Sequence, residues 1–178
     1  DLFVESIFYK DFPSIEPNQD FKKINFDQLP EGILKRCKIN LLTESVEEQT
    51  LSNQCCEFAM VNPLKLGLEA KYGWMATAEK KTGNGPLQAI KKLDLNNGTF
   101  HTWSIAPRGF VSEPLMIPRS SSKEEDHGWV LVLTWNGALQ ENELVVLNAE
   151  DLSHQATLRL PLKIPYGLHG SWVDSKEL

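Results

Sequence analysis

The chain has 178 residues, and its 18 lysines and arginines against 24 aspartates and glutamates give a formal net charge of −6. This acidic balance argues against a nucleic-acid-binding surface. No run of about 18 apolar residues, the length a membrane span needs, occurs in the sequence. Three cysteines are too few for a disulfide framework. We therefore expect one intracellular, cytoplasmic domain with reduced, mostly buried thiols.

The N-terminal part, residues 1–52, contains three short runs that are apolar and β-prone enough to predict strands. They cover residues 2–9, 33–41 and 48–52, the last being a short outer strand. The segment from 10 to 32 is polar and holds three prolines, which favours a long surface loop with one helical turn.

Residues 53–162 continue with short β-branched and aromatic runs separated by polar turns. The predicted strands are 55–61, 72–78, 87–95 and 99–105, followed by 109–115, 128–135, 143–148 and 156–160. Asn97-Gly98 predicts a two-residue hairpin turn, because a type I′ turn needs positive φ at both positions. Polar segments at 79–86 and 120–126 are expected to be loops. No sustained helical periodicity occurs, so the predicted fold class is all-β.

Three ionisable residues recur at a fixed interval in apolar, β-prone settings. Glu113 lies 56 positions after Glu57, and His169 lies 56 positions after Glu113. A period of this size with several strands per period favours β-propeller blades. Because the innermost strand of every blade faces a common axis, we expect the three side chains to converge. One imidazole and two carboxylates at one axis indicate a metal centre.

The same period divides the chain into one partial propeller domain covering residues 1–178. The predicted parts are a blade remnant at 1–52, a blade at 53–107, a blade at 108–162 and a closing inner strand at 163–173. The remnant lacks an inner strand, and the closing strand lacks the rest of its blade. Two full blades cannot close a ring, so each end is expected to leave an unpaired sheet edge.

Several motifs, in this order along nearly the whole chain, resemble the C-terminal part of the carotenoid cleavage oxygenase family. They are 56–58 (CEF) with 62–63 (NP), 110–114 (FVSEP) with 117–119 (IPR), 125–129 (EDHGW), 147–152 (LNAEDL) and 165–170 (PYGLHG). The resemblance implies about two full blades plus flanking strands of a seven-bladed β-propeller with one non-haem Fe(II) on its axis. It also implies that four histidines bind the iron, while outer glutamates accept N–H bonds from three of them.

By motif match, His169 is the last iron ligand, and Glu57 and Glu113 are supporting glutamates. The remaining ligands are expected upstream of residue 1, so this chain alone is expected to be inactive. The implied reaction is cleavage of a conjugated C=C bond of a carotenoid or apocarotenoid by O₂, giving carbonyl products. The implied partners are O₂, an apolar polyene and the remainder of the propeller. Phe110 and Trp172 are candidates for lining the substrate tunnel.

Alternatives to this function stay open at the sequence level. A stilbene-like phenolic alkene would suit the same family chemistry, and a non-catalytic propeller fragment or binding module would also fit a single histidine. A plastid location and peripheral membrane contact through parts outside this chain are also open.

The other histidines and the cysteines have plainer interpretations. His101, His127 and His154 lie in or near turns and outer strands, where solvated surface histidines are expected. The adjacent Cys55 and Cys56 are expected to pack in the core. The acidic run at 124–126 lacks the ligand spacing of a calcium site and is expected to be a solvated loop.

Overall fold

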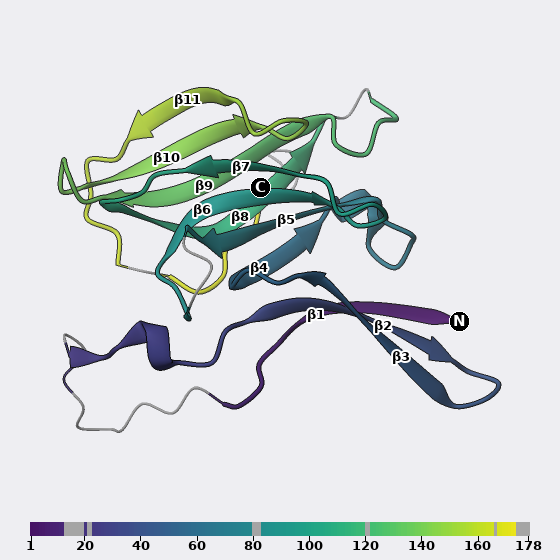
Figure 1. The fold of residues 1–178 in the computed structure, drawn as a ribbon. Coiled ribbons are helices and arrows are strands. Elements are labelled where there is room, and N and C mark those ends of the chain that lie inside the picture. The colour runs from purple at the N-terminus through teal and green to yellow at the C-terminus, as the bar shows by residue number, and fades with distance from the viewer. Residues whose placement is uncertain (13–19, 21–22, 80–82, 120–121, 166, 174–178) are drawn as a thin grey trace.

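The structure is a computed structural model that describes residues 1–12, 20, 23–79, 83–119, 122–165 and 167–173. In this part of the chain three antiparallel sheets carry the fold, which confirms the all-β prediction (Figure 1). The helical pieces described are two single turns, η2(Phe26–Gln28) and η3(Pro63–Lys65). No helix among the described residues has the length and apolar character to cross a bilayer.

The first sheet has the order β1-β2-β3, with β1(Leu2–Phe8), β2(Ile33–Asn40) and β3(Ser45–Ser52). All three strands fall where the sequence predicted them, although β3 is longer than expected. The loop between β1 and β2 contains the predicted helical turn, η2, in its described part. Asn25 caps this turn, since its side chain accepts a hydrogen bond from the Asp27 N–H.

The second and third sheets each have four strands in sequence order. The second contains β4(Cys56–Val61), β5(Tyr72–Ala78), β6(Leu87–Asp94) and β7(Phe100–Ser104). The third contains β8(Gly109–Pro118), β9(Gly128–Asn136), β10(Glu141–Asn148) and β11(His154–Arg159). Four-stranded meanders of this kind are the expected form of propeller blades. They fall within the predicted blades 53–107 and 108–162, whose boundaries stay a prediction.

The hairpin between β6 and β7 differs in detail from its prediction. Asp94 N–H donates to Thr99 O, so the loop has four residues instead of two. Gly98 takes a left-handed φ of 76°, and the Asp94 carboxylate accepts the N–H groups of Asn96 and Asn97. The aspartate side chain therefore holds a wider turn than the Asn97-Gly98 pair alone predicts.

The main core lies between the second and third sheets. Trp74 on β5 is fully buried there, and its indole N–H donates to Ala149 O at 3.2 Å. The buried members of this core are Trp74, Ala76, Ile90, Val111, Met116, Val130, Val132, Val145, Leu147, Ala149 and Leu152. Because aromatic and branched side chains of both sheets contribute, the two sheets are held as neighbours.

A smaller core joins the first sheet to the second. It contains Leu34, Cys56, Met75, Leu93 and Leu95. Both Cys55 and Cys56 are fully buried free thiols, as predicted. Burial raises the pKa of Cys56 to about 11, so the thiol stays protonated at neutral pH.

The first strands of the second and third sheets, β4 and β8, share an irregularity. The pairing of β4 with β5 shifts between Glu57 and Met60, and that of β8 with β9 shifts between Val111 and Pro114. Such β-bulges re-aim the side chains of the extra residues. Glu57 and Glu113 therefore both lie at bulges, a feature that periodicity alone did not indicate.

The segment after β11 was predicted to be a closing inner strand, and this assignment stays a prediction. The described residues 160–165 and 167–173 form no strand. A strand needs a neighbour for its backbone N–H and C=O groups, and this segment pairs with none of the described strands. The N–H groups of Leu160, Ile164 and Gly170 instead donate separate hydrogen bonds to Asn142 and Glu113 of the third sheet.

Candidate metal centre

Glu113 and His169 are in direct contact, although 56 positions separate them. His169 Nδ1 lies 3.3 Å from Glu113 Oε1, and the Gly170 N–H donates to Glu113 Oε2 at 2.8 Å. Both carboxylate oxygens therefore hold the same short stretch of the C-terminal segment. The tautomer in which Nδ1–H donates to the carboxylate leaves the Nε2 lone pair free.

The imidazole also meets an aromatic ring from β4. The Phe58 and His169 ring centroids are 5.7 Å apart with an interplanar angle of 88°, an edge-on contact. Phe58 reaches this position from the β4 bulge, where it has a φ of 55°. A positive φ is uncommon outside glycine and asparagine, so the bulge imposes this orientation.

Glu57 lies in the same neighbourhood but has different partners. Its Oε1 accepts a hydrogen bond from the Tyr9 hydroxyl, and its Oε2 accepts the Phe58 N–H at 3.3 Å. Burial raises the pKa of the Glu57 carboxyl, while the Phe58 N–H and the nearby His169 oppose that rise. Among the described residues, Glu57 thus bonds to a tyrosine where Glu113 bonds to the histidine.

Sequence reasoning missed Tyr9, which lies just after β1 in a part of the chain without a recognised motif. Its approach depends on Gly32. A Cβ atom at Gly32 would lie 2.9 Å from Tyr9 Oη and 2.7 Å from Cys56 O. A side chain there would push the tyrosine or the strand away. A glycine next to a strand run was the one available hint, and it did not identify the partner.

The two aromatic residues predicted to line a tunnel lie in different places. Phe110 is half-buried and lines a cavity of about 170 Å³ together with residues such as Ser112, Asn142 and Ile164. Trp172 has 59% of its surface exposed and is absent from the lining of that cavity. Their role in substrate binding stays a prediction.

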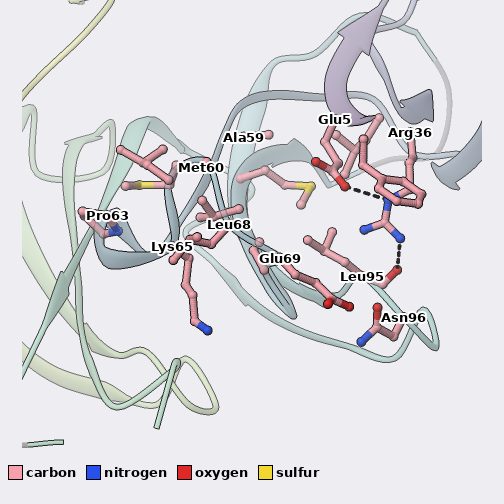
Figure 2. A pocket seen from close by; sticks show the side chains of 18 of the residues that line it. Glu5, Arg36, Ala59, Met60, Pro63, Lys65, Leu68, Glu69, Leu95 and Asn96 are labelled. Carbon is pink, nitrogen blue, oxygen red and sulfur yellow. Dashed lines mark hydrogen bonds and ion pairs between the residues drawn. The ribbon is translucent and has the colours of Figure 1, made fainter. Parts of the chain in front are cut away.

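A separate groove lies between β1, β2 and the segment that follows β4. It has a volume of about 740 Å³ and is lined by Met60, Leu68 and Leu95, among others (Figure 2). Arg36 crosses it, donating to Glu5 Oε1 at 2.6 Å and to Leu95 O at 3.4 Å. Glu57, Glu113 and His169 do not line this groove. This groove is therefore separate from the candidate metal centre.

The remaining histidines were predicted to be solvated surface residues, which holds for His101 and His154 and only in part for His127. His101 and His154 are exposed, while His127 is half-buried with its Nε2 3.1 Å from Arg119 Nη1. In the part of the chain that the structure describes, no three histidine, cysteine or acidic side chains form a group able to hold a metal. The described residues thus provide one imidazole with its supporting carboxylate.

The acidic run at 124–126 is only partly the solvated loop that was predicted. Glu124 is exposed. Glu125 Oε1 accepts the N–H groups of Lys71 and Tyr72, both at 2.8 Å, and Asp126 forms an ion pair with Lys92. The prediction is wrong for Glu125 and Asp126, because both carboxylates bond across to the second sheet.

One protein family and several known proteins are similar to this chain. The model of the retinal pigment epithelial membrane protein family matches residues 1–174. The apocarotenoid-15,15′-oxygenase of Synechocystis is 42% identical over 176 residues, which cover 98% of this chain and 36% of that protein. The resveratrol cleavage oxygenase 1 of Aspergillus fumigatus is 46% identical over 132 residues, covering 72% of this chain and 25% of that protein.

More distant relatives include the chloroplastic 9-cis-epoxycarotenoid dioxygenase NCED6 of Arabidopsis thaliana, 30% identical over 146 residues that cover 82% of this chain and 25% of that protein. Among solved structures, cobalt-substituted Synechocystis ACO superposes with a TM-score of 0.93 at 42% identity, covering 97% of this chain and 36% of that one. This likeness confirms the predicted fold class, part of a β-propeller.

The chain belongs to the carotenoid cleavage oxygenase family, the family of the retinal pigment epithelial membrane protein. It spans about a third of the length of the Synechocystis relative.

Proposed function

We propose that His169 supplies one imidazole ligand to a non-haem Fe(II) centre, and that Glu113 holds this imidazole in place. The observation that carries the proposal is the contact of His169 Nδ1 with Glu113 Oε1 at 3.3 Å. Metal-binding histidines usually donate their other ring N–H to a carboxylate or a carbonyl, which fixes the tautomer and the ring orientation. The pair fits that pattern, since Nε2 is left free to bind the metal.

The neighbouring groups restrict how the imidazole can turn. The Gly170 N–H holds the second oxygen of Glu113, so the carboxylate itself is oriented. The Phe58 ring packs perpendicular to the imidazole on one side. His169 still has 76% of its side chain exposed among the described residues, which leaves room for a metal at Nε2.

The reaction we propose for the whole protein is O₂-dependent cleavage of a conjugated C=C bond, giving two carbonyl products. Fe(II), when bound, supplies the activation of O₂. This chain's own contribution is to bind and orient: His169 and Glu113 hold the metal position, and apolar surface near them excludes water. Phe110 and Trp172 are proposed to lie along the path of the substrate. No protein acid or base is required by this chemistry.

A carotenoid or apocarotenoid is the substrate class that we favour, together with O₂ as the second substrate. Support comes from the 42% identity to an apocarotenoid oxygenase over nearly the whole chain. A stilbene-like phenolic alkene is the second candidate, because the 46% identity to a fungal resveratrol cleavage oxygenase is higher over a shorter stretch.

Two further proposals concern the surroundings of the protein. We keep a cytoplasmic location as expected from the free thiols, with a plastid location supported by the plant relative named chloroplastic. We also propose that the metal is completed by parts of a propeller outside this chain, because one imidazole cannot hold catalytic iron alone.

The test compares the full-length protein with its His169→Ala variant. We expect wild type to hold iron and to cleave an apocarotenoid, while the variant loses both bound iron and turnover. Iron is measured in the purified proteins, and products are measured with an apocarotenoid and with resveratrol as separate substrates. Preferential cleavage of resveratrol would shift the substrate class. Normal iron content in His169→Ala would refute the ligand assignment, and wild type without iron or products would favour a binding module.

A further inference from the structure

We infer that Asn142 is a positioning residue for the candidate iron ligand. It lies on β10, and its buried side chain anchors the segment that carries His169. The inference rests on the proposed function, because it gives the anchored histidine its role as a ligand. It adds a residue that no motif of the family resemblance included.

The contacts of Asn142 use its backbone and both ends of its side chain. Its Oδ1 accepts the Ile164 N–H at 2.8 Å, its Nδ2 donates to Thr134 O at 3.4 Å, and its backbone carbonyl accepts the Leu160 N–H at 3.0 Å. The residue is 5% exposed. Asn142 therefore joins β9 on one side to both ends of the turn 160–164 on the other.

These bonds fix the C-terminal segment on the near side of His169. The Ile164 N–H is held by Asn142, and the Gly170 N–H is held by Glu113 on the far side. His169 lies five positions after Ile164, and an extended chain over five positions reaches roughly 17 Å. With both flanks pinned to the same sheet, the backbone of His169 is confined near Glu113.

The chain between the two pins also packs on the sheet. Ile164, Pro165 and Gly167 line the same small cavity as Phe110 and Asn142. Losing the Ile164 bond would open this cavity edge and free the segment up to Gly170. Because a ligand must be held closely in its productive position, such loosening should weaken metal binding before it unfolds the protein.

An amide is the side chain that this position requires. Alanine would remove the side-chain partner of the Ile164 N–H and of the buried Thr134 carbonyl, which costs stability. Aspartate keeps an oxygen for the Ile164 N–H, but it loses the donor to Thr134 and buries a charge. The aspartate variant therefore separates the bond to the segment from the stability of the sheet.

Asn62 offers a matched control elsewhere in the molecule. It is 3% exposed, its Nδ2 donates to Glu125 O at 2.7 Å, and its Oδ1 accepts the Leu64 N–H at 2.9 Å. Like Asn142, it is a buried amide that ties a connecting segment to a sheet. Among the described residues, neither of these bonds reaches the segment 160–170, so its removal reports the general cost of losing such an amide.

The experiment uses the full-length protein with Asn142→Ala, Asn142→Asp and Asn62→Ala. Three quantities are measured: Fe(II) affinity by competition titration, the thermal midpoint, and hydrogen exchange of the peptide 161–173 in metal-free protein. We expect both alanine variants to lower the thermal midpoint by similar amounts. Only Asn142→Ala should speed exchange of 161–173 and weaken Fe(II) binding by roughly 10-fold, the lower range for outer-shell changes.

The aspartate variant should split the readouts. It should bind Fe(II) more tightly than Asn142→Ala even if its thermal midpoint is lower, because the Ile164 bond is retained. Equal weakening of Fe(II) binding by Asn62→Ala and Asn142→Ala would overturn the inference, as would wild-type exchange of 161–173 in Asn142→Ala. A failure of the proposed function is seen separately, since His169→Ala would then keep its iron whatever the exchange data show.

Discussion

Two segments of this molecule cross over to a sheet and are held there in contrasting ways: the loop between β8 and β9, and the C-terminal segment around His169. We call each of them a crossing. The loop between β8 and β9 is tied to the second sheet by the ion pair of half-buried Asp126 with buried Lys92, and by three further hydrogen bonds from Asn62, Lys71 and Tyr72. The C-terminal segment around His169 is tied to the third sheet by the Ile164 N–H bond to Asn142 and by the two contacts of Glu113 with His169 and Gly170. The first crossing is structural, whereas the second carries the candidate ligand.

The first crossing contributes mainly to the stability of the fold, whereas the second mainly sets the orientation of His169. Lys92 is 5% exposed and its ammonium also donates to Glu150 O and lies 4.0 Å from the Tyr72 ring centroid. These contacts exclude water from the ion pair, so separating the loop from the second sheet would leave a buried charge without its partner. His169, by contrast, stays exposed in the described part and depends on its orientation. Breaking the first crossing should cost unfolding free energy, and breaking the second should cost metal affinity.

The largest effect is expected from Asp126→Ala. Removing one partner of a buried pair typically costs 3–5 kcal/mol, and we expect about 3 kcal/mol because Glu150 O and Tyr72 still contact Lys92. The free energy of unfolding is measured by urea denaturation of the full-length protein. Glu124→Ala, two positions earlier and exposed, should change it by less than about 0.5 kcal/mol. Equal effects of the two substitutions would mean that the loop is solvated after all.

Next in size is the effect of Glu113→Gln on metal binding. The amide keeps an acceptor oxygen but loses the charge that steadies the imidazole, so Fe(II) affinity should fall by roughly 10–100-fold. Glu143→Gln is the control, because this buried carboxylate of the same sheet bonds to the Asn136 side chain and not to a histidine. Fe(II) titration of the two variants decides. Unchanged affinity in Glu113→Gln would return Glu113 to a purely structural role.

The sequence predicted the strands and the approach of Glu113 to His169. It did not predict the other bonds that hold the two crossings. Alternating apolar residues predict strands locally. The 56-residue interval predicts which residues take equivalent places in neighbouring blades. Met116 N–H, for example, meets Met60 Sδ at 3.2 Å across the same interval. Such regularity survives because each blade repeats the same packing.

What the sequence did not predict depends on partners far along the chain. The acidic run looked solvated because Lys92 and Tyr72 lie more than thirty positions earlier in a different sheet. The bulges at Glu57 and Glu113 depend on strand pairing, which composition does not encode. The segment 163–173 has the β-prone composition of a strand, yet the structure gives it no pairing neighbour among the described residues.

A smaller effect is expected from Tyr9→Phe, which tests how Glu57 differs from Glu113. The substitution removes the hydroxyl that donates to Glu57 and leaves the Phe58 N–H as its remaining bond. Unfolding free energy should fall by about 1 kcal/mol, measured by urea denaturation. Hydrogen exchange of 161–173 should not change, because Tyr9 holds Glu57 and not the C-terminal segment. Faster exchange there would show that the two glutamates act as one unit.

The smallest effect is the coupling of Glu113 with His169 in metal-free protein. A double-mutant cycle with Glu113→Gln, His169→Ala and the double variant isolates this pair in the free energy of unfolding. Since His169 is 76% exposed, we expect a coupling of at most about 1 kcal/mol, as for other exposed pairs. Glu57→Gln combined with His169→Ala should show less coupling, because Glu57 bonds to Tyr9. A coupling well above 1 kcal/mol would mean that the C-terminal segment is held for stability, and the contrast between the two crossings would then fail.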